Sequence, residues 1–335
     1  MNSEEIEKII DSASLPDSCL HSEYLETPQA FVILSDNYAF KIWKPEKTDE
    51  YDHTTLENRK KVCKKEVKLN EQLSSGLYEK VIPLKRLKGI SNDSSVQKEV
   101  VDYAVKMKRL DYSGNFFFRL KGNRVQSSDI KILAKAIARF HKSAREIRNS
   151  FKLQIFNQRF AELKRCNVFI EELNLPDLSA ILRNAIETVN AYIRHNRYYL
   201  QERENSGMIK NCHGNLTADN IFLEEKPVIM GRILFHPELR YMDVLKDLAR
   251  LGVDLDYYFF EEYDRLLLQH YLREIKEQEP YQAGTFYTFY KTFVVGMLIG
   301  ELIDATTPFT LDSLNKNKLL RYFNLMESYC EQLKY

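Results

Sequence analysis

The segment from His213 to Leu223 holds the residues whose types and spacing are best suited to chemistry. An amide at Asn215 is followed, after four intervening residues, by a second amide at Asn220 and then by an apolar run. Loops that transfer phosphoryl groups place a proton acceptor and a metal-binding amide at this separation. Asn220 supplies the amide, but Asn215 has no usable basicity in water. His213 is expected to pack and to form backbone hydrogen bonds, not to act as a catalyst.

Lys41 and Glu66 form a second pair of interest. Ala39, Lys41 and Trp43 share one strand face, because successive residues of a strand point to opposite sides. Ala39 leaves room for a nucleotide base and Lys41 reaches phosphates, although a solvated lysine on an edge strand is the alternative. Glu66 follows Val62 on a helical stripe, where a carboxylate facing a core needs a cation. We therefore expect a Lys41–Glu66 ion pair, with a rim position for Glu66 as the alternative.

Carboxylates for a metal ion are missing from the hairpin that follows the loop. The stretch 227–235 contains no Asp, and Gly231 offers no side-chain ligand. Mg²⁺ usually takes one or two protein carboxylates besides phosphate oxygens, so this composition does not favour a magnesium site. Arg232 is expected either to contact phosphate as a cation or to lie on the surface.

Two acids stand at the start of the next helix. Asp243 suits the N-terminus of that helix, because a carboxylate there caps N–H groups and interacts favourably with the helix dipole. Asp247 is placed to accept hydrogen bonds from the backbone of the loop that starts at His213. We expect Asp247 to hold the shape of that loop without taking part in catalysis.

Hydrophobic patterning divides the chain into a β-rich first part and a helical second part. In the first part we expect strands at Ala30–Leu34, Tyr38–Trp43, 81–87 and 100–110, a helix from Thr54 or Thr55 to about Leu73, and a loop at 89–95. In the second part we expect helices at about 127–147, 156–173 and 178–199, short strands at 221–223 and 228–235, and further helices to the C-terminus. The natural boundary lies near residues 109–113.

Size, charge and sorting signals limit the classes of protein. The 335 residues are 44% hydrophobic, enough for two lobes, and a formal net charge of +1 gives no global attraction to nucleic acid or membrane. The basic segment 59–68 is expected to be a solvated helix face. The N-terminus lacks an apolar signal core, and the apolar run 293–299 is far short of the ~20 residues that cross a bilayer. We expect a cytoplasmic protein that binds neither nucleic acid nor membrane.

The five cysteines are far apart, odd in number and free of any CxxC pair. They indicate neither a zinc site nor a disulfide framework, and reduced thiols fit best. They are Cys19, Cys63, Cys166, Cys212 and Cys330.

Taken together, these segments resemble the aminoglycoside phosphotransferase and protein-kinase-like superfamily. The closest likeness is to a bacterial branch of uncharacterised phosphotransferase-like proteins, whose members often carry a second, P-loop domain; this chain has no such motif. The resemblance implies an α+β, two-lobed kinase-like fold, with a β-rich lobe at residues 1–109 and a helical lobe at 110–335. The matching segments are 31–45, 55–59, 63–73, 103–109, 213–223 and 235–255.

The resemblance assigns ATP-binding roles in the first lobe. Lys41 would bind the α- and β-phosphates of ATP, and Glu66 would orient Lys41. The residues Tyr103, Ala104, Val105 and Met107 would form a hinge that contacts the adenine edge. No Gly-rich phosphate loop precedes Lys41, because the turn at 35–37 contains no glycine.

The resemblance also shows where this sequence departs from an active enzyme. The catalytic Asp of the family falls on Asn215 and its metal-binding Asp on Gly231, while Asn220 would remain as a metal ligand. Loss of a general base costs ~10²–10⁴ in rate, and loss of a metal ion removes several kcal/mol of transition-state stabilisation. Both losses together predict a pseudokinase that binds ATP, another small molecule or a protein partner, with little role for Mg²⁺.

Two other functions remain open from the sequence. One is an active small-molecule kinase with a rearranged metal site, whose substrate lies against the helix around 281–306 and meets Glu301 and Asp304 if it is cationic. The other is an interaction module that binds no nucleotide. The aromatic residues of that helix would line the substrate site or, alternatively, form a core; they are Tyr281, Phe286, Tyr287, Phe289, Tyr290 and Phe293.

Overall fold

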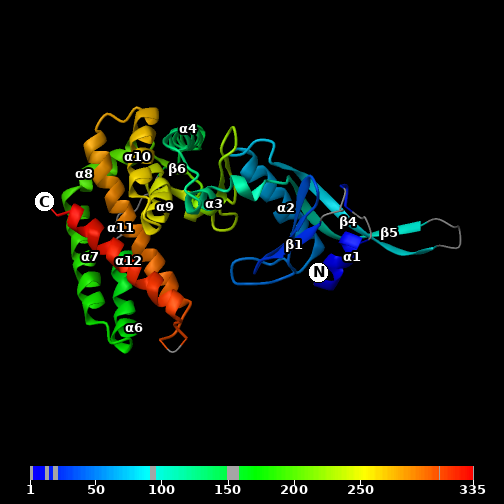
Figure 1. Ribbon diagram of the computed structural model, residues 1–335, viewed down its shortest axis with the longest axis horizontal. Helices are drawn as coiled ribbons and strands as arrows, with labels where there is room; N and C mark the ends of the chain where they lie inside the picture. Colours follow the sequence, from blue (N-terminus) through cyan, green and yellow to red (C-terminus); the bar gives the residue numbers. More distant parts are fainter. Residues whose placement is uncertain are drawn as a thin grey trace. The chain divides into compact units, whose positions relative to one another are not determined.

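The computed structural model describes residues 3–11, 15–17, 22–90, 96–148, 158–308 and 310–334. Contacts divide the chain into two compact units, one of Met1–Arg119 with Asn220–His236 and one of Leu120–Asp219 with Pro237–Tyr335. The first is built around a β-sheet and the second is mainly helical (Figure 1). The α+β class is therefore confirmed, whereas the lobe boundary at residue 109 stays a prediction.

A five-stranded antiparallel sheet, in the order β1-β2-β3-β5-β4, forms the frame of the first unit. β2 and β3 have the bounds that alternation predicts. The elements of this part are α1 (Ser3–Asp11), β1 (Glu23–Glu26), β2 (Ala30–Leu34), β3 (Tyr38–Trp43), α2 (Leu56–Glu71), β4 (Tyr78–Ile90) and β5 (Val96–Lys108).

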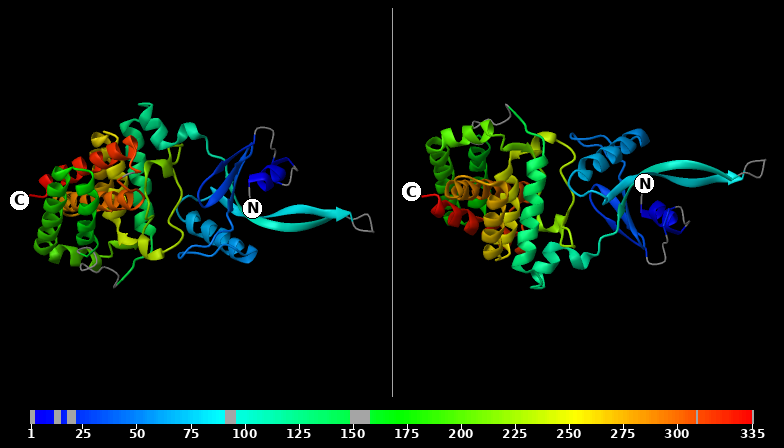
Figure 2. Two further views of the ribbon diagram at one scale, coloured as in Figure 1. Left: turned by 90° about the horizontal axis from the view of Figure 1, so that it is seen from below. Right: turned by 90° about the horizontal axis from the view of Figure 1, so that it is seen from above.

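β4 and β5 are longer than predicted. β5 pairs with β3 only from Ala104 to Lys108, but with β4 as far as Val96. The far ends of the two strands therefore continue past the sheet as a two-stranded ribbon (Figures 1 and 2). Of the loop predicted at 89–95, the first two residues belong to β4 and residues 91–95 lie outside the described residues.

The two faces of the sheet pack against different helices, because alternate strand residues point to opposite sides. One face carries Phe40 and Ala104, which pack with Ile6 of α1. The opposite face carries Trp43 and Val105, which pack in a separate cluster that includes residues of α2. Lys41 lies on the second of these faces, between Trp43 and Ala39 in the strand.

Helices make up most of the second unit. They are α4 (Ser127–Ser143), α6 (Cys166–Glu172), α7 (Pro176–His195), α8 (Arg197–Asn205), α9 (Val244–Tyr257), α10 (Glu261–Ile275), α11 (Pro280–Asp304) and α12 (Ser313–Gln332). α3 (Phe116–Lys121) crosses between the units, and the short strands are β6 (Ile209–Asn211), β7 (Ile221–Phe222), β8 (Val228–Ile229) and β9 (Tyr241–Asp243).

Several predicted bounds in this part are wrong. The helix predicted at 178–199 is two helices, α7 and α8, separated at Asn196. α4 ends at Ser143, so the predicted extension to 147 is not helical. The strand predicted at 228–235 keeps only its first two residues as β8. Residues 156–157 of the remaining predicted helix lie outside the described part, and the rest of it is interrupted by a 3-10 turn at Glu162–Arg165.

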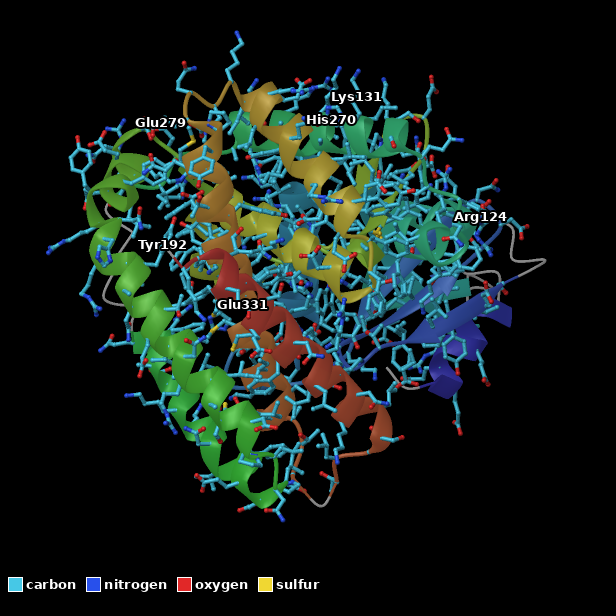
Figure 3. All side chains as sticks on the ribbon, turned by 60° about the vertical axis from the view of Figure 1, so that its left-hand side comes forward. Arg124, Lys131, Tyr192, His270, Glu279 and Glu331 are labelled. Carbon is cyan, nitrogen blue, oxygen red and sulfur yellow. The ribbon has the colours of Figure 1, made fainter. Side chains whose placement is uncertain are left out.

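The aromatic stripe of α11 forms the core of the second unit. Phe286, Tyr287, Phe289, Tyr290 and Phe293 are all buried. Tyr192, labelled on α7 in Figure 3, stacks its ring on Phe289 with centroids 4.9 Å apart. Of the predicted stripe, Tyr281 alone is exposed. The core alternative is therefore correct for the other five rings.

α11 is the single helix in the described part of the chain that is long and apolar enough to cross a membrane. Its most apolar window is 72% buried inside the fold, as expected of a core helix. Four cysteines, Cys63, Cys166, Cys212 and Cys330, are free and buried, and Cys19 lies outside the described residues.

Candidate functional site

The predicted Lys41–Glu66 ion pair is present. Lys41 Nζ lies 2.7 Å from Glu66 Oε1 and 4.1 Å from the centroid of the Trp43 ring. Trp43 Nε1 donates to the other carboxylate oxygen of Glu66 at 2.9 Å. The side chain of Lys41 is 24% exposed while that of Glu66 is 6% exposed. An oriented ammonium with remaining exposure and two further N–H groups is suited to bind phosphate oxygens.

α2 holds Glu66 in place through contacts at both of its ends. At the start, the side chain of Thr55 accepts from the backbone N–H of Asn58 at 3.2 Å and caps the helix. Arg59 Nε then donates to the buried carboxylate of Asp102 on β5 at 2.8 Å. Near the end, Asn70 donates to the carbonyl of Glu66 at 3.0 Å. These contacts fix the helix against the sheet, and thereby fix the ion pair.

Gly231 lies next to Asn220, as the resemblance implies. The φ angle of Gly231 is +78°, and a Cβ added there would lie 3.0 Å from Asn220 Oδ1. An Asp at this position would be strained, because L-residues rarely adopt this backbone conformation and the neighbouring amide is already close. The donor set of one amide and a glycine does not fit Mg²⁺, which prefers carboxylates in octahedral geometry.

The surface position predicted for Arg232 is wrong, because its side chain is buried, with 3% exposure. A contact with phosphate stays a prediction. Arg232 Nη1 donates to the carbonyl of Leu69 at 2.9 Å and to Gln72 Oε1 at 3.3 Å, and its backbone N–H donates to Asn70 Oδ1 at 3.2 Å. The guanidinium thus satisfies the C-terminal end of α2 and anchors the segment that contains Gly231.

In the second unit, Asp247 holds the His213 loop as predicted. The backbone N–H groups of His213 and Gly214 donate to the two carboxylate oxygens of Asp247 at 2.8 and 2.9 Å. His213 is fully buried, and its Nδ1 accepts from the backbone N–H of Asn215 at 3.2 Å. The Asn215 residue itself is exposed. The loop therefore has a shape imposed by His213 and Asp247, with an amide where a base would stand.

The environment of Asp247 keeps its carboxylate charged. Burial would raise the pKa of Asp247, but hydrogen bonds and charges from His141 and His213 outweigh it and hold the pKa below its usual range. His141 Nε2 lies 3.1 Å from Asp247 Oδ2, and His141 Nδ1 lies 2.8 Å from the hydroxyl of Tyr271. Cys212 completes a group with metal-ligand spacing. Because N–H donors already occupy both oxygens of Asp247, this group is a structural support.

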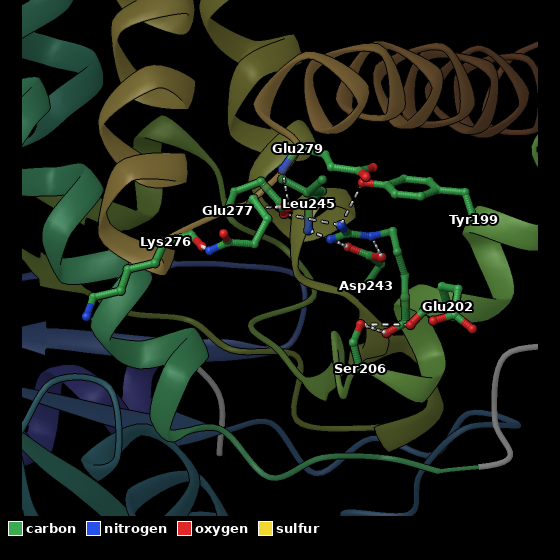
Figure 4. A network of polar contacts seen from close by, with 10 residues as sticks. Tyr199, Glu202, Ser206, Asp243, Leu245, Lys276, Glu277 and Glu279 are labelled. Carbon is green, nitrogen blue, oxygen red and sulfur yellow. Dashed lines mark hydrogen bonds and ion pairs between the residues drawn. The ribbon is translucent and has the colours of Figure 1, made fainter.

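Asp243 caps α9, as predicted (Figure 4). Its Oδ1 accepts from the backbone N–H of Leu245 at 2.8 Å. The same carboxylate accepts two hydrogen bonds from the guanidinium of Arg203, at 2.5 and 2.9 Å, in a pair that is almost fully buried. This bidentate geometry fixes the start of the helix that carries Asp247.

The residues predicted as an adenine hinge lie within β5, not in a connecting segment. Val105 is paired with Lys41 on one side and with Val81 on the other. Ala104 is buried on the sheet face that packs against α1, opposite to the face of Lys41. Tyr103, Val105 and Met107 share the face of Lys41. A nucleotide contact by these four residues stays a prediction.

Two acids near the His213 loop were missed from the sequence. Asp254 Oδ2 accepts from the backbone N–H of Ala218 at 3.0 Å, and Arg250 pairs with the other oxygen at 2.7 Å. Partial burial and the charge of Asp254 raise the pKa of Asp219, which directly precedes Asn220. The position of Asp219 directly before Asn220 is the sequence signal that could have identified it as a site residue.

The acids predicted to meet a cationic substrate have different surroundings. Asp304 forms a bidentate pair with Arg165, with Nη2 to Oδ2 at 2.7 Å, so a cation already neutralises it. Partial burial raises the pKa of Glu301. Substrate recognition by either residue stays a prediction.

No family model matches the chain. Uncharacterised proteins of Mycobacterium tuberculosis and Mycobacterium bovis are 25% identical over 277 residues, which is 80% of this chain and 53% of theirs. The chain thus spans about half the length of the curated relatives that it matches.

Several solved structures with the same fold are named as aminoglycoside phosphotransferases or choline kinases. The ADP-bound structure of an aminoglycoside phosphotransferase has a TM-score of 0.52 at 13% identity and covers 100% of both chains. Choline kinase from Cryptosporidium parvum has a TM-score of 0.56 at 12% identity and covers 98% of this chain and 97% of its own. A GDP complex of a mutant aminoglycoside 2'-phosphotransferase has a TM-score of 0.56 at 15% identity, with 99% and 98% coverage. The chain therefore has the two-lobed, protein-kinase-like fold of the predicted superfamily.

Proposed function

We propose that this protein is a pseudokinase that binds a nucleotide through Lys41 and does not transfer its phosphoryl group. The observation that carries the proposal is the left-handed Gly231 beside Asn220, with a Cβ position 3.0 Å from the amide oxygen. This backbone does not merely lack a carboxylate; it disfavours one. Asn215 removes the base in the other unit, so both requirements for chemistry fail independently.

Support for nucleotide binding comes from the first unit. The Lys41–Glu66 pair at 2.7 Å orients an ammonium, and structures of the same fold include complexes with ADP and with GDP. Glu66 is also fixed by Trp43, so the ammonium is pre-organised before a ligand arrives. Binding by a lysine needs no metal ion. We therefore expect ATP to bind about equally well with and without magnesium.

Thermal unfolding with ATP, in magnesium and in EDTA, tests this function. A ligand that binds the native state at a concentration 100 times its Kd adds about 2.7 kcal/mol to the free energy of unfolding. The proposal expects a rise in Tm that does not depend on magnesium and that is lost in Lys41→Met. A rise only with magnesium would contradict it. No rise at millimolar ATP would instead favour a module that binds a protein and no nucleotide.

A second candidate function, an active kinase with a rearranged site, is favoured by one observation. Asp219 directly precedes Asn220 and has a raised pKa, as expected of a residue that takes over the work of a base. Release of ADP from ATP separates the two functions. An active enzyme would lose most of its turnover in Asp219→Asn, whereas the pseudokinase has no turnover in either protein. Asn215→Asp alone should leave the pseudokinase without turnover, because Gly231 still offers no metal ligand, whereas it should raise the turnover of an active enzyme.

A further inference from the structure

The first unit contains a hollow that none of the proposed nucleotide-binding residues lines. It has a volume of about 290 Å³ and lies beside the N-terminal half of α2. Residues from three parts of the chain meet there, namely the segment before α2, the helix itself and the segment after β8. Those that matter for binding are Tyr51, Asp52, His53, Lys61, Lys65 and Phe235.

One wall of the hollow is a cluster of three aromatic rings. The Tyr51 ring stacks on His53 and on Phe235, with centroids 4.3 Å and 4.8 Å away and interplanar angles of 20° and 27°, and the His53 and Phe235 rings also contact each other with centroids 5.3 Å apart. Trp43 supports this wall edge-on, at 5.3 Å from His53 and 5.6 Å from Phe235. Tyr51 and Phe235 keep partial exposure. Such a wall offers a flat apolar surface of the kind that receives a planar ring.

The other wall carries two lysines one helical turn apart. Lys61 and Lys65 are exposed on α2, and Lys65 Nζ lies 5.7 Å from the centroid of Phe235. Lys61 has a contact of 3.8 Å with Glu57, in which both side chains are more than 60% exposed and the attraction is therefore weak. Asp52 is the single acid among the six, and its carboxylate already accepts from the backbone and hydroxyl of Thr54. An anion would therefore meet two cations.

The imidazole ring of His53 is the buried member of the aromatic wall. The residue is 97% buried, since its exposure is 3%, and its Nδ1 has no hydrogen-bond partner among the described residues. Burial and the charge of Arg59 lower the pKa of His53, so the ring is neutral near pH 7 and Nδ1 is either a donor or an acceptor. Nδ1 is enclosed inside the fold and not open to the hollow, so His53 contributes to the site as a fixed, neutral ring that supports Tyr51.

We infer that this hollow binds a small planar aromatic anion, namely a single ring that carries a phosphate or carboxylate group. The ring lies against Tyr51 and Phe235, and the anionic group lies between Lys61 and Lys65. Neither Lys41 nor Glu66 lines the hollow, so the site is separate from the proposed nucleotide site.

The hollow is connected to the Lys41–Glu66 pair through the wall itself. Trp43 packs against two rings of the wall and also donates to Glu66 Oε2 at 2.9 Å. Val62 lines the hollow one helical turn before Glu66. A ligand that orders the wall therefore restrains the partner of Lys41 and strengthens nucleotide binding. This effect on the nucleotide rests on the proposed function, whereas the occupancy of the hollow does not.

Phenyl phosphate is the probe, and Trp43 is the reporter because it is the single tryptophan in the chain. A saturable change in tryptophan fluorescence is expected, with saturation-transfer NMR of the probe as an independent readout. Replacing both cations, Lys61→Ala with Lys65→Ala, should weaken binding at least about tenfold. Lys64→Ala, on the same helix but outside the hollow, is the matched control and should bind as the wild type does. Equal binding by the double variant would overturn the inference.

Three further arms complete the test. Inorganic phosphate and phenol should each bind at least about tenfold more weakly than phenyl phosphate, because each uses one wall only. Equal binding of inorganic phosphate would mean a basic surface and not a built site, and would overturn the inference. Lys41→Met should keep the phenyl phosphate site and lose the ATP-induced rise in Tm. If Lys41→Met instead loses the probe while the double variant keeps it, the probe occupies the nucleotide site and the inference fails, whatever ATP does.

Discussion

Lys41 and Glu66 in the first unit and the His213 loop in the second differ in what the sequence has kept. In the first unit the functional groups themselves are intact, with the ammonium and carboxylate 2.7 Å apart. In the second, the groups that shape the loop are intact, since Asp247 accepts both backbone N–H groups, but the base position holds Asn215. The first unit thus presents an oriented lysine that a ligand can contact. The His213 loop has the hydrogen bonds that fix its shape, but Asn215 offers no base.

The difference indicates that the hydrogen bonds which shape the His213 loop are needed for folding, independently of any catalysis. Asp247 is fully buried and charged, so losing it would leave His213, Gly214 and His141 without an acceptor. That penalty falls on folding whether or not the protein is an enzyme. Exchange of an exposed residue such as Asn215 carries no comparable penalty. The hydrogen bonds that shape the loop therefore contribute to folding whether or not the protein is an enzyme, and the comparison can be tested by breaking each region in turn.

Asp247→Ala should give the largest effect. It removes the acceptor of two buried backbone N–H groups and of His141, and we expect a loss of about 3–5 kcal/mol in the free energy of unfolding, measured by urea denaturation. Asp304→Ala, which breaks an exposed pair with Arg165, is the matched control and should cost less than about 1 kcal/mol. Similar losses in the two variants would refute the structural role of Asp247.

The same variant should change the pH dependence of stability. The pKa of Asp247 is lowered by folding, so its contribution is fully present above the unfolded value, near 4, and is lost as the pH falls through the folded value. Wild type should therefore lose stability on acidification below about pH 4 more steeply than Asp247→Ala. Parallel curves for the two proteins would show that the carboxylate is not held in its charged form.

Glu66→Gln should give an intermediate effect in the first unit. The amide keeps an acceptor for Trp43 but loses the charge that pairs with Lys41, and we expect a loss of about 1.5–3 kcal/mol in the free energy of unfolding. The ATP-induced rise in Tm should fall as well, because Lys41 is no longer oriented. Glu57→Gln, exposed on the same helix, is the control and should change neither quantity. If Glu66→Gln loses stability but keeps the full ATP-induced rise in Tm, the ion pair is not required for nucleotide binding.

Periodicity accounts for what could be predicted from the sequence. The two-residue repeat placed Ala39, Lys41 and Trp43 on one face, and the helical stripe placed Glu66 toward that face. Both signals are local, and the two elements had only to pack together for the ion pair to form. The position of Asp247 followed from the motif in the same way. The positions of these residues could be predicted because the local sequence determines which face of a strand or helix each side chain lies on.

The errors arose where distant residues decide the outcome. Arg232 is buried because the end of α2, more than 150 residues earlier, offers it carbonyl and amide oxygens. Its own neighbours give no sign of this. The bounds of β5 likewise depend on its pairing with β3 and β4, which the residues of β5 alone do not reveal. The break between α7 and α8 at Asn196 was likewise invisible, since the apolar pattern continues through it.

Gly231→Ala, compared with Gly76→Ala, should give the smallest effect and the sharpest test of the metal position. Both glycines have positive φ angles, +78° and +81°, but an added Cβ meets Asn220 Oδ1 at 3.0 Å in the first and nothing within 4 Å in the second. Each substitution carries the backbone penalty of about 1–2 kcal/mol, and the contact with Asn220 adds to it at Gly231 alone. Urea denaturation of the two variants, each against wild type, measures this difference. A clearly larger loss for Gly231→Ala would mean that the backbone itself resists a side chain at the position where the resemblance places a metal-binding carboxylate. Equal losses would mean that Asn220 moves aside at no cost, and Gly231→Asp together with Asn215→Asp would then be the variant in which to look for restored phosphoryl transfer.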